Sequence, residues 1–480
     1  MEGRDGSSTK RREPRAAVVG GGPTGTLASL VLRKHGFQVE LIEKQADPRH
    51  RKEDRCFEVP LLLNERGMEA LQRVGAKEEV RRSAIEINGQ TVHLGSMEVK
   101  REPFGDEGDK LHCLSGKAIL KVLLDRADSK GVHLNFESRL VGLDIEQGLL
   151  HLERNGEHRQ MRVVGGREPQ MQVELIVGAD GGHSMVREEM KKVSRMNFSR
   201  SFRGHGYRTV IIPPHNGMFA LDPNTLHMWP RKNFGLLALP NPDHSFTCII
   251  CLPFHGENSF ETMCSDGEVF AFLKREFPDV AVCVMSAPLR FLEQPIVPMS
   301  FSEAFPAHAG SKALLIGKAA CEVLPIGEFH DNIGLEDCLL LDDLIGEYGT
   351  GRTCLETVFR KYSTISLDRF ELMRPLSSDM LENVIGLSPN RFLQLKHMME
   401  GALIRALPRS TGLTTARSAV SFTSLPYGQV KSMSRKKDIG MGLVGVCLIA
   451  SITAGASYAM HRRWKYHEPV NQLHSTMGLT

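Results

Sequence analysis

Residues 16–25 read Ala-Ala-Val-Val-Gly-Gly-Gly-Pro-Thr-Gly, a short apolar run followed at once by a glycine-rich turn. The apolar run predicts a buried strand, and the apolar residues within 27–32 have the spacing of a helix. The turn follows the GxGxxG arrangement, in which backbone can approach a pyrophosphate, through Gly20, Gly22, Thr24 and Gly25. N–H groups at the start of the helix would face the phosphates. This stretch therefore predicts a Rossmann-like, dinucleotide-binding α/β fold.

Two further apolar runs extend the same prediction. Residues 37–44 (FQVELIEK) predict a second strand that ends in Glu43, about 20 residues after the first glycine, where a carboxylate accepts hydrogen bonds from ribose hydroxyls. Residues 175–178 predict another buried strand, which a sharp turn at Asp180 and Gly181 ends. We interpret this turn as a second wall of the nucleotide site; the alternative is a polar turn at a strand end with no ligand.

A third segment, residues 311–338, has the same strand–turn–helix order. Ala313–Ile316 predicts a buried strand, and a helix is expected to open at Asn332, with Glu336 and Asp337 in its early turns. N–H groups at the start of such a helix could reach an anionic ring edge of the cofactor.

Composition excludes several classes of function. The 480 residues include 60 Lys and Arg against 57 Asp and Glu, and this near-balance argues against a nucleic-acid partner, which would require a basic excess. The 10 cysteines are scattered along the chain, so neither a metal site nor a disulfide framework is predicted. Residues 1–13 lack the apolar region of a secretory signal and are expected to be a disordered lead-in.

Residues 439–460 (IGMGLVGVCLIASITAGASYAM) contain no charged side chain. At about 1.5 Å per residue, a helix of this length crosses a hydrocarbon core of about 30 Å, so we expect one transmembrane anchor. The alternative is a buried core helix. Cations flank both ends of the stretch: Lys431, Arg435, Lys436, Lys437, Arg462, Arg463 and Lys465. A short tail at 461–480 and basic flanks favour a mitochondrial outer membrane anchor with the folded body facing the cytosol.

Taken in order, these segments resemble the FAD-dependent aromatic hydroxylases of the p-hydroxybenzoate hydroxylase type, and within them the kynurenine 3-monooxygenase family. The resemblance covers nearly the whole chain and is most specific in its middle. The matching runs are His205–Tyr207, Ile212–Pro214, Asn216–Gly217, Leu226–Arg231, Ala238–Asn241, Ser245–Cys248 and Phe277–Asp279. The C-terminal anchor also matches, since animal members of this family carry one in the mitochondrial outer membrane.

The resemblance implies a function. NADPH reduces FAD, and molecular oxygen then supplies one atom to an activated aromatic ring, a small substrate of tryptophan catabolism in that family. The family has no separate NADPH domain, so the single GxGxxG turn is assigned to FAD. The loop that begins at Pro325 and the residue Asn332 are implied to lie beside the flavin ring.

Several functional positions depart from the family pattern. The Arg and Tyr that bind the substrate carboxylate in the family fall on Gln90 and Phe104 here. Each lost charge-assisted contact is typically worth about 1.5–3 kcal/mol, so an amino-acid substrate should bind poorly and a less anionic ring is expected.

The cofactor positions depart as well. A Ser-Arg pair becomes Ser-Gly at Gly116, with Lys117 beside it, and an aspartate becomes Lys318. In the loop beside the flavin, two glycines become Glu328 and His330, which should add side chains and bar a positive φ if the loop needs one.

These departures leave three hypotheses. The first is a membrane-anchored FAD- and NADPH-dependent monooxygenase that hydroxylates an aromatic ring. The second is a catalytically impaired relative that keeps the scaffold for binding or regulation. The third is a flavin oxidoreductase that oxidises NADPH and yields only hydrogen peroxide.

The family architecture implies a discontinuous FAD-binding domain and a β-sheet substrate domain, followed by a helical part and the anchor. The first is expected at 14–88, 114–195 and 300–375, and the second at 89–113 and 196–299. Helices at 376–430 are expected to cover the pocket.

Overall fold

The computed structural model describes most of the chain. The described residues are 13–50, 58–94, 99–105, 108–154, 157–161, 173–284, 289–387, 415–433 and 457–458. Residues 1–424 form one compact unit and residues 425–480 a second. The two sheets and the helices that position the site all belong to the first unit.

A six-stranded sheet carries the nucleotide motifs. In spatial order its strands are β18 (His308–Ala309), β19 (Ala313–Leu315), β12 (Leu175–Gly178), β1 (Arg15–Val19), β2 (Gln38–Ile42) and β8 (His133–Asn135). All pairs are parallel except β18 with β19. Buried apolar side chains fill β1 and β12, so both read as continuous hydrophobic runs, as strands covered on both faces do. This sheet brings the ends of β1, β2 and β12 together at one edge.

An eight-stranded sheet forms the second layer. Its strands in spatial order are β20 (Cys321–Glu322), β17 (Val297–Phe305), β13 (Asn197–Ile212), β16 (Phe246–Pro253), β15 (Phe234–Pro240), β14 (Thr225–Arg231), β5 (Gly89–His93) and β6 (Val99–Pro103). Only β14 and β5 run parallel. The chain leaves the first sheet for β5 and β6, returns, and leaves it again for β13–β17, so each sheet is built from separate segments.

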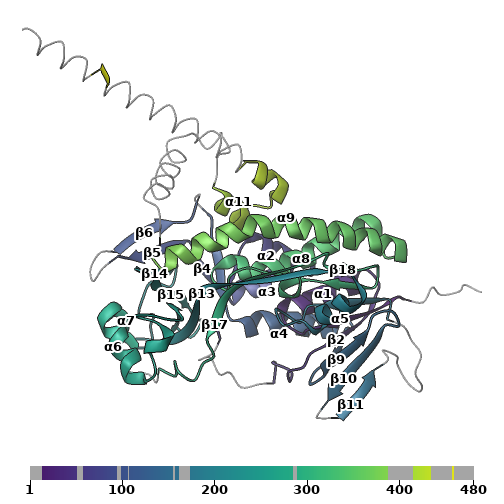
Figure 1. Cartoon of the computed structure of the whole chain (residues 1–480), viewed down its shortest axis with the longest axis horizontal. Coiled ribbons are helices and arrows are strands. Elements are labelled where there is room, and N and C mark those ends of the chain that lie inside the picture. Colours follow the sequence, from purple (N-terminus) through teal and green to yellow (C-terminus); the bar gives the residue numbers. More distant parts are fainter. Residues whose placement is uncertain are drawn as a thin grey trace, which may run out of the picture. The chain divides into compact units, whose positions relative to one another are not determined.

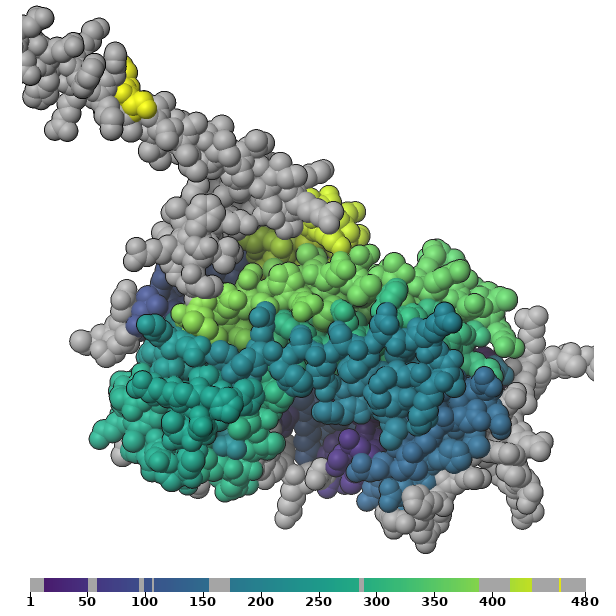
Figure 2. Space-filling model, viewed as in Figure 1, coloured from purple at the N-terminus to yellow at the C-terminus, as the bar shows by residue number. Residues whose placement is uncertain are grey.

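Helices cover both sheets (Figure 1). They are α1 (Pro23–Lys34), α2 (Glu65–Arg73), α3 (Lys77–Arg82), α4 (Gly116–Ser129), α5 (Met185–Val193), α6 (Asp266–Glu276), α7 (Pro278–Val284), α8 (Glu328–Tyr348), α9 (Arg352–Val384) and α11 (Ala416–Phe422). Two small three-stranded sheets complete the described strands. One has the order β3 (Leu61–Leu63), β7 (Leu111–Leu114), β4 (Ile85–Ile87), and the other has the order β11 (Glu157–Met161), β10 (Leu149–Arg154), β9 (Arg139–Asp144). Helix α9 runs as a long ridge along the unit (Figure 2).

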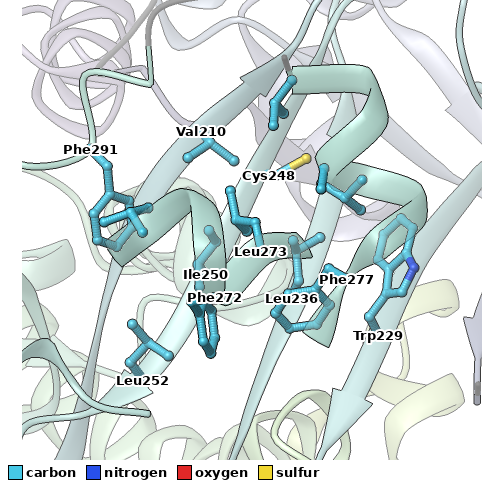
Figure 3. Close-up of a cluster of buried hydrophobic side chains, with 14 of the residues drawn as sticks. Val210, Trp229, Leu236, Cys248, Ile250, Leu252, Phe272, Leu273, Phe277 and Phe291 are labelled. Carbon is cyan, nitrogen blue, oxygen red and sulfur yellow. The ribbon is translucent and has the colours of Figure 1, made fainter. Parts of the chain in front are cut away.

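The eight-stranded sheet has two different faces. Alternate side chains such as Val210, Ile250 and Leu236 pack with Phe272 and Phe277 of the α6–α7 region into a buried apolar core (Figure 3). The intervening side chains therefore point to the opposite face, which α9 approaches closely at Gly235. A Cβ on Gly235 would lie 1.8 Å from the Val384 carbonyl oxygen, so a glycine is needed there.

The alternation also separates Cys248 and Cys251, which stand in CxxC spacing on β16. Cys248 belongs to the α6–α7 core, whereas Cys251 lies on the opposite face, next to Tyr207 on β13. Both are buried free thiols. The spacing therefore does not make a pair of ligands on this strand.

The predicted α/β fold is confirmed in its sheets and helices. Among the described residues, no helix is both long and apolar enough to cross a membrane. The predicted anchor at 439–460 lies outside the described residues, apart from positions 457–458.

A buried histidine pair lies on the α6–α7 side of the sheet. His93 Nε2 is 3.1 Å from His227 Nδ1, and the Trp229 ring stacks on His93 at 4.1 Å. Burial lowers the pKa of each imidazole to about 4. The ordinary pKa of histidine is about 6.5, so the unfolded chain protonates these two residues below that pH. In the folded state both imidazoles stay neutral until the pH is much lower, so protonation favours unfolding.

We expect the free energy of unfolding to fall by about 2–3 kcal/mol as the pH drops from 6.5 to 4. Urea unfolding followed across this range measures it, and His227→Gln should flatten the dependence. His255→Gln is the control, because that ring is 87% exposed. An unchanged slope in His227→Gln would show that the pair is not the cause.

Candidate functional site

The glycine turn between β1 and α1 is shaped by close backbone approaches. Gly20 has φ +108°, and a Cβ there would meet the Ala179 carbonyl oxygen at 2.4 Å. A Cβ on Gly25 would lie 1.8 Å from the Gly20 carbonyl oxygen. A Cβ on Gly22, in contrast, would meet no protein atom within 4 Å. The turn thus has no room for side chains at two positions and leaves open space at the third, where backbone can approach a ligand.

Glu43 follows β2 and reaches back to this turn. Its Oε2 accepts a hydrogen bond from the Gly21 N–H at 2.7 Å, and its Oε1 accepts one from the Gln45 N–H at 2.8 Å. The carboxylate is only partly buried. The structure thus brings Glu43 and the glycine turn together, as the ribose-binding prediction requires.

The turn after β12 adjoins the glycine turn through the contact of Gly20 with residue 179. Asp180 Oδ2 accepts hydrogen bonds from the Met185 and Val186 N–H groups at 2.7 and 3.2 Å. Its Oδ1 is buried and has no hydrogen-bond partner in the described part of the chain. Burial raises the pKa of Asp180. Gly181 has φ +82° and carries the reversal of the chain. An unsatisfied carboxylate oxygen at this edge is suited to accept a ligand hydroxyl.

Thr24 fastens the glycine turn to α8. A Cβ on Gly334 would meet Thr24 Oγ1 at 2.1 Å, so the two helices touch at a glycine. Behind this contact, Asp337 Oδ2 accepts a hydrogen bond from the Gly317 N–H at 2.5 Å and Oδ1 pairs with Arg369. Asp337 and Arg369 are both buried. This buried ion pair holds the 317–319 turn against α8 and α9.

Lys318 lies in that turn among other titratable groups. Burial lowers the pKa of its ammonium, which interacts electrostatically with Asp331 and Glu322. Burial raises the pKa of Asp331 to about 6. Burial and the Lys318 charge hold the pKa of His330 well below its usual range, while its Nδ1 donates to the Val323 carbonyl oxygen at 3.1 Å. This turn therefore carries a partly buried lysine beside a carboxyl group, Asp331, whose pKa is raised to about 6.

Helix α8 starts at Glu328, four residues before the predicted Asn332 (332 − 328 = 4). The preceding Gly327 has φ +73°, whereas Glu328 and His330 belong to the helix. The loop needs no positive φ at these two positions, because its positive φ falls on Gly327. Pro325 lies just before, partly exposed.

The Glu328 side chain does not project into the loop. Its Oε1 accepts hydrogen bonds from Arg417 Nε at 3.2 Å and Ser421 Oγ at 3.0 Å, both on α11. Burial alone would raise the pKa of this carboxyl, but the Arg417 charge lowers it overall. The residue that replaces a family glycine thus fixes α11 to the start of α8.

Asn332 has a structural role in its side chain. Its Nδ2 donates to the carbonyl oxygens of Leu62 and Glu328 at 2.7 and 2.6 Å, and its Oδ1 accepts from the Asn64 N–H at 3.2 Å. These bonds join α8 to β3 and α2. Any contact of Asn332 with the cofactor must therefore use its main chain.

Gly116 is the first residue of α4, and the nearest charge is an acid that the sequence analysis did not single out. Glu58 Oε1 accepts from Ser115 Oγ at 2.7 Å and from the Lys117 N–H at 3.0 Å. The position expected to hold an arginine in the family is Gly116 here, and the Glu58 carboxylate lies beside it, 3.4 Å from where a Cβ would stand. The favourable field of the helix explains its position.

Gln90 and Phe104 lie at the β5–β6 edge of the second sheet. Gln90 Nε2 donates to Glu102 Oε2 at 2.8 Å, and strand register places Gln90 on the face opposite the α6–α7 core. The Phe104 ring is buried and stacks on Phe422 of α11 at 5.6 Å. Tyr207 points to the same sheet face and interacts electrostatically with Asp331 across it. Gln90 and Tyr207 share the sheet face opposite the α6–α7 core, and with Phe104 against α11 they mark this face as the candidate substrate site.

Comparison with known proteins agrees with this geometry. The FAD binding domain model matches residues 13–366. The chain is 30% identical over 439 residues to the kynurenine 3-monooxygenase of Myxococcus xanthus, covering 90% of each chain. The chain belongs to this family of flavin-dependent monooxygenases. The kynurenine 3-monooxygenase of Sus scrofa is 30% identical over 349 residues, which is 72% of each chain.

Solved structures show the same fold. The chain matches 2-methyl-3-hydroxypyridine-5-carboxylic acid oxygenase with a TM-score of 0.61 at 20% identity, over 78% of this chain and 92% of that one. It matches PqsL, a probable FAD-dependent monooxygenase from Pseudomonas aeruginosa, with a TM-score of 0.58 at 16% identity, over 77% and 97% of the chains.

The family identifies FAD as the cofactor and NADPH as its reductant. The nucleotide half of the site fits FAD: the space at Gly22 is open, Glu43 lies at the turn, and Asp180 Oδ1 lacks a partner among the described residues. The other half of the site differs from the family pattern at Lys318, which replaces an aspartate. An ammonium group can pair with a phosphate, but it cannot accept a hydrogen bond from a hydroxyl group.

Proposed function

We propose that the chain is an FAD- and NADPH-dependent hydroxylase of an aromatic ring whose side chain is neutral or cationic. FAD supplies the redox chemistry with NADPH and oxygen; the protein binds and orients the ring and excludes water from it. The observation that carries this proposal is the hydrogen bond between Gln90 and Glu102. It places a neutral amide and a carboxylate where relatives are expected to hold an anion.

Charge decides the preference for substrate. A carboxylate in this position would lack a guanidinium partner and would lie beside Glu102, a like charge that is itself paired with Lys100 at 2.5 Å. The hydroxyl of a tyrosine is also missing, because position 104 is a phenylalanine, whose ring stacks on Phe422. An amine or neutral side chain, in contrast, would find acceptor oxygens on Gln90 and Glu102. The described contacts therefore favour a substrate that has the aromatic ring but no carboxylate.

The test compares L-kynurenine with its decarboxylated amine on the FAD-loaded protein. We expect the amine to accelerate NADPH oxidation at a concentration at least about tenfold lower, since each lost charge-assisted contact is worth about 1.5–3 kcal/mol. Mass spectrometry of the product should show one added oxygen atom. Equal stimulation by both compounds would contradict the proposal.

Three substitutions should reverse the preference. Gln90→Arg and Phe104→Tyr restore the anion contacts, and Glu102→Gln keeps the new guanidinium from being neutralised. We expect the KM for L-kynurenine to fall by about tenfold or more in this variant. Gln90→Leu is the matched control, because it changes size and polarity without adding charge, and it should leave the carboxylate disfavoured.

A catalytically impaired scaffold is the second candidate. Lys318, with Asp331 and His330 beside it, supports this reading because it stands where the family is expected to hold an aspartate, and an ammonium group cannot accept a hydroxyl hydrogen bond. It predicts FAD binding without a hydroxylated product. NADPH oxidation that yields only hydrogen peroxide would instead favour an uncoupled flavin reductase.

We further propose that residues 439–460 anchor the chain in a membrane, the mitochondrial outer membrane with the folded body in the cytosol. The absence of charge over this stretch and its basic flanks support this. Val446→Arg with Leu448→Arg should release the protein from carbonate-washed membranes, since two central charges oppose insertion. Val446→Leu with Leu448→Ile should leave it bound; release of both would contradict the anchor.

A further inference from the structure

The turn η3 (Gly317–Ala319) holds the backbone of Lys318 at the cofactor site. A Cβ on Gly317 would meet Thr24 Cγ2, in the glycine turn, at 3.1 Å. On its other side, the Gly317 N–H donates to the buried Asp337 Oδ2 at 2.5 Å. Lys318 therefore starts from a fixed point next to the residues predicted to hold the pyrophosphate of FAD.

The side chain of Lys318 extends toward the start of α8. Its charge acts on His330 and Asp331, in the first turn of that helix, and on Glu322 of β20. Burial lowers the pKa of the ammonium group, although both acids favour its charge. Among the described residues, none forms a hydrogen bond or an ion pair with it. The side chain is partly exposed, so an anionic group of a ligand can reach this cation.

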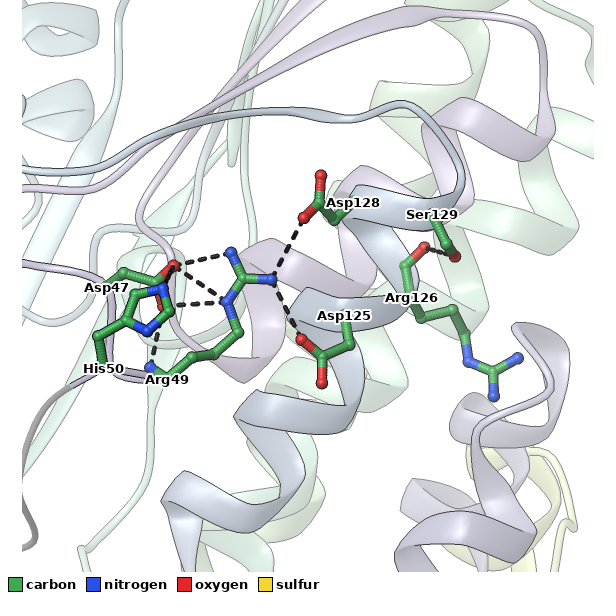
Figure 4. A network of polar contacts seen from close by, with 7 residues as sticks. All are labelled: Asp47, Arg49, His50, Asp125, Arg126, Asp128 and Ser129. Carbon is green, nitrogen blue, oxygen red and sulfur yellow. Dashed lines mark hydrogen bonds and ion pairs between the residues drawn. The ribbon is translucent and has the colours of Figure 1, made fainter.

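Arg49 differs from Lys318, because its charge is balanced within the protein. The guanidinium is paired with Asp47 at 2.7 Å, Asp125 at 3.1 Å and Asp128 at 3.4 Å (Figure 4). Three acids surround one cation there, which leaves no excess of positive charge for a ligand. Of these two cations near the predicted FAD site, Lys318 is the one with which an anionic group can still pair.

Asp331 supplies an opposite charge close to Lys318. Its Oδ2 accepts a hydrogen bond from the Leu62 N–H at 2.9 Å, which fixes the carboxyl group against β3. Glu322, the other acid, lies 3.7 Å from the Arg200 guanidinium and so has a cation of its own. The start of α8 therefore presents one positive and one negative side chain close together.

Lys318 and Asp331 lie between the glycine turn and the candidate substrate site. Lys318 adjoins the turn through its neighbour Gly317, and Asp331 interacts electrostatically with Tyr207, which faces the substrate site. FAD extends from its pyrophosphate, predicted at the glycine turn, to a ring that must meet the substrate. The ring of a bound FAD would therefore lie against these two charges.

We propose that the Lys318 ammonium group pairs with the negative charge of the reduced flavin and raises the reduction potential of bound FAD, and that Asp331 lowers it. The inference rests on the proposed function for its use of FAD and NADPH. NADPH transfers a hydride, which is two electrons and one proton, and leaves as NADP⁺, so the neutral oxidised ring gains one negative charge. A nearby cation favours that charged ring over the neutral one, whereas a nearby carboxylate opposes it.

The test measures the reduction potential of FAD bound to the full-length protein, by equilibration with a reference dye in the absence of oxygen and of any aromatic substrate. It is made at about pH 7.5, where Asp331, with its pKa of about 6, is mostly ionised. We expect Lys318→Met to weaken the binding of reduced FAD relative to oxidised FAD by about tenfold, which is a fall of about 30 mV for a two-electron couple. Asp331→Asn should raise the potential by a similar amount, and it keeps an oxygen atom for the Leu62 N–H.

Two control variants separate the effect of charge from a structural effect. Lys318→Arg keeps the positive charge and should keep most of the potential. Lys274→Met removes an exposed lysine of α6 and should leave the potential unchanged. The affinity of each variant for oxidised FAD and for ADP is measured in parallel by calorimetric titration.

The outcomes separate this inference from the hydroxylase proposal. A lower potential in Lys318→Met together with a higher one in Asp331→Asn supports the inference even if no ring is hydroxylated. An unchanged potential in both variants, or a shift of the same sign in both, overturns it even if a ring is hydroxylated. Weaker binding of both ADP and oxidised FAD by Lys318→Met, at an unchanged potential, also overturns it and assigns the ammonium group to the pyrophosphate. A wild-type protein that binds no FAD would overturn both proposals.

Discussion

Replacing Arg369 with methionine is expected to lower the free energy of unfolding by about 3–5 kcal/mol. Asp337 is fully buried, and Arg369 provides its counter-charge. Without the guanidinium, the carboxylate would keep its hydrogen bond from the Gly317 N–H but would carry an unpaired charge in the core. Urea unfolding followed by tryptophan fluorescence measures the loss.

Two companion variants make the cause of this effect testable. Asp337→Asn in the Arg369→Met background should recover part of the stability, because the uncompensated charge disappears. Arg374→Met on the exposed side of α9 should change the free energy of unfolding by less than about 0.5 kcal/mol. If Arg369→Met and Arg374→Met lowered the free energy of unfolding by similar amounts, the buried ion pair would contribute no more to stability than an exposed arginine does. Because Asp337 also holds Gly317, we expect the first variant to retain FAD less tightly.

Gly25→Ala is expected to lower FAD affinity by at least about 100-fold. The added methyl group would lie 1.8 Å from the Gly20 carbonyl oxygen, so α1 or the turn has to move. Either movement displaces the N–H groups that face the phosphates. Titration with FAD, followed by quenching of flavin fluorescence, measures the affinity.

At the same turn, Gly22→Ala distinguishes an effect on FAD binding from an effect on folding stability. Its φ of −73° suits alanine, and its Cβ would meet no described protein atom within 4 Å. We therefore expect the FAD-free protein to unfold at an unchanged urea concentration, whereas FAD affinity falls at least about tenfold because the methyl group fills the space for the pyrophosphate. Normal FAD binding by Gly22→Ala would place the phosphates elsewhere.

The local motifs could be predicted because they depend on residues close together in the sequence. The strand, glycine turn and helix at residues 15–34 are fixed by periodicity and by the need for glycine at a close backbone approach. Glu43 was predictable for the same reason, from its distance along the chain. The start of α8 was misplaced by four residues (332 − 328 = 4), because no cap side chain marks it and the signal is the positive φ of Gly327.

The partners of the altered residues could not be predicted, because they come from distant parts of the chain. Glu328 pairs with Arg417, Phe104 stacks on Phe422, and Glu58 meets the start of α4. No spacing rule relates such positions. From the sequence alone, a glutamate in place of a glycine is expected to disrupt the loop, because its ion-pair partner is not known. Asp337 was noticed only as an acid early in a helix, while its pairing with Arg369 required the packing of α8 on α9.

The sequence by itself determined that this protein is an α/β nucleotide-binding chain with a GxGxxG turn, and its motif runs determined the family resemblance. Only the tertiary structure decided what Gln90, Phe104, Glu328 and Lys318 face, because side-chain charge acts over a few ångströms in space and not along the sequence.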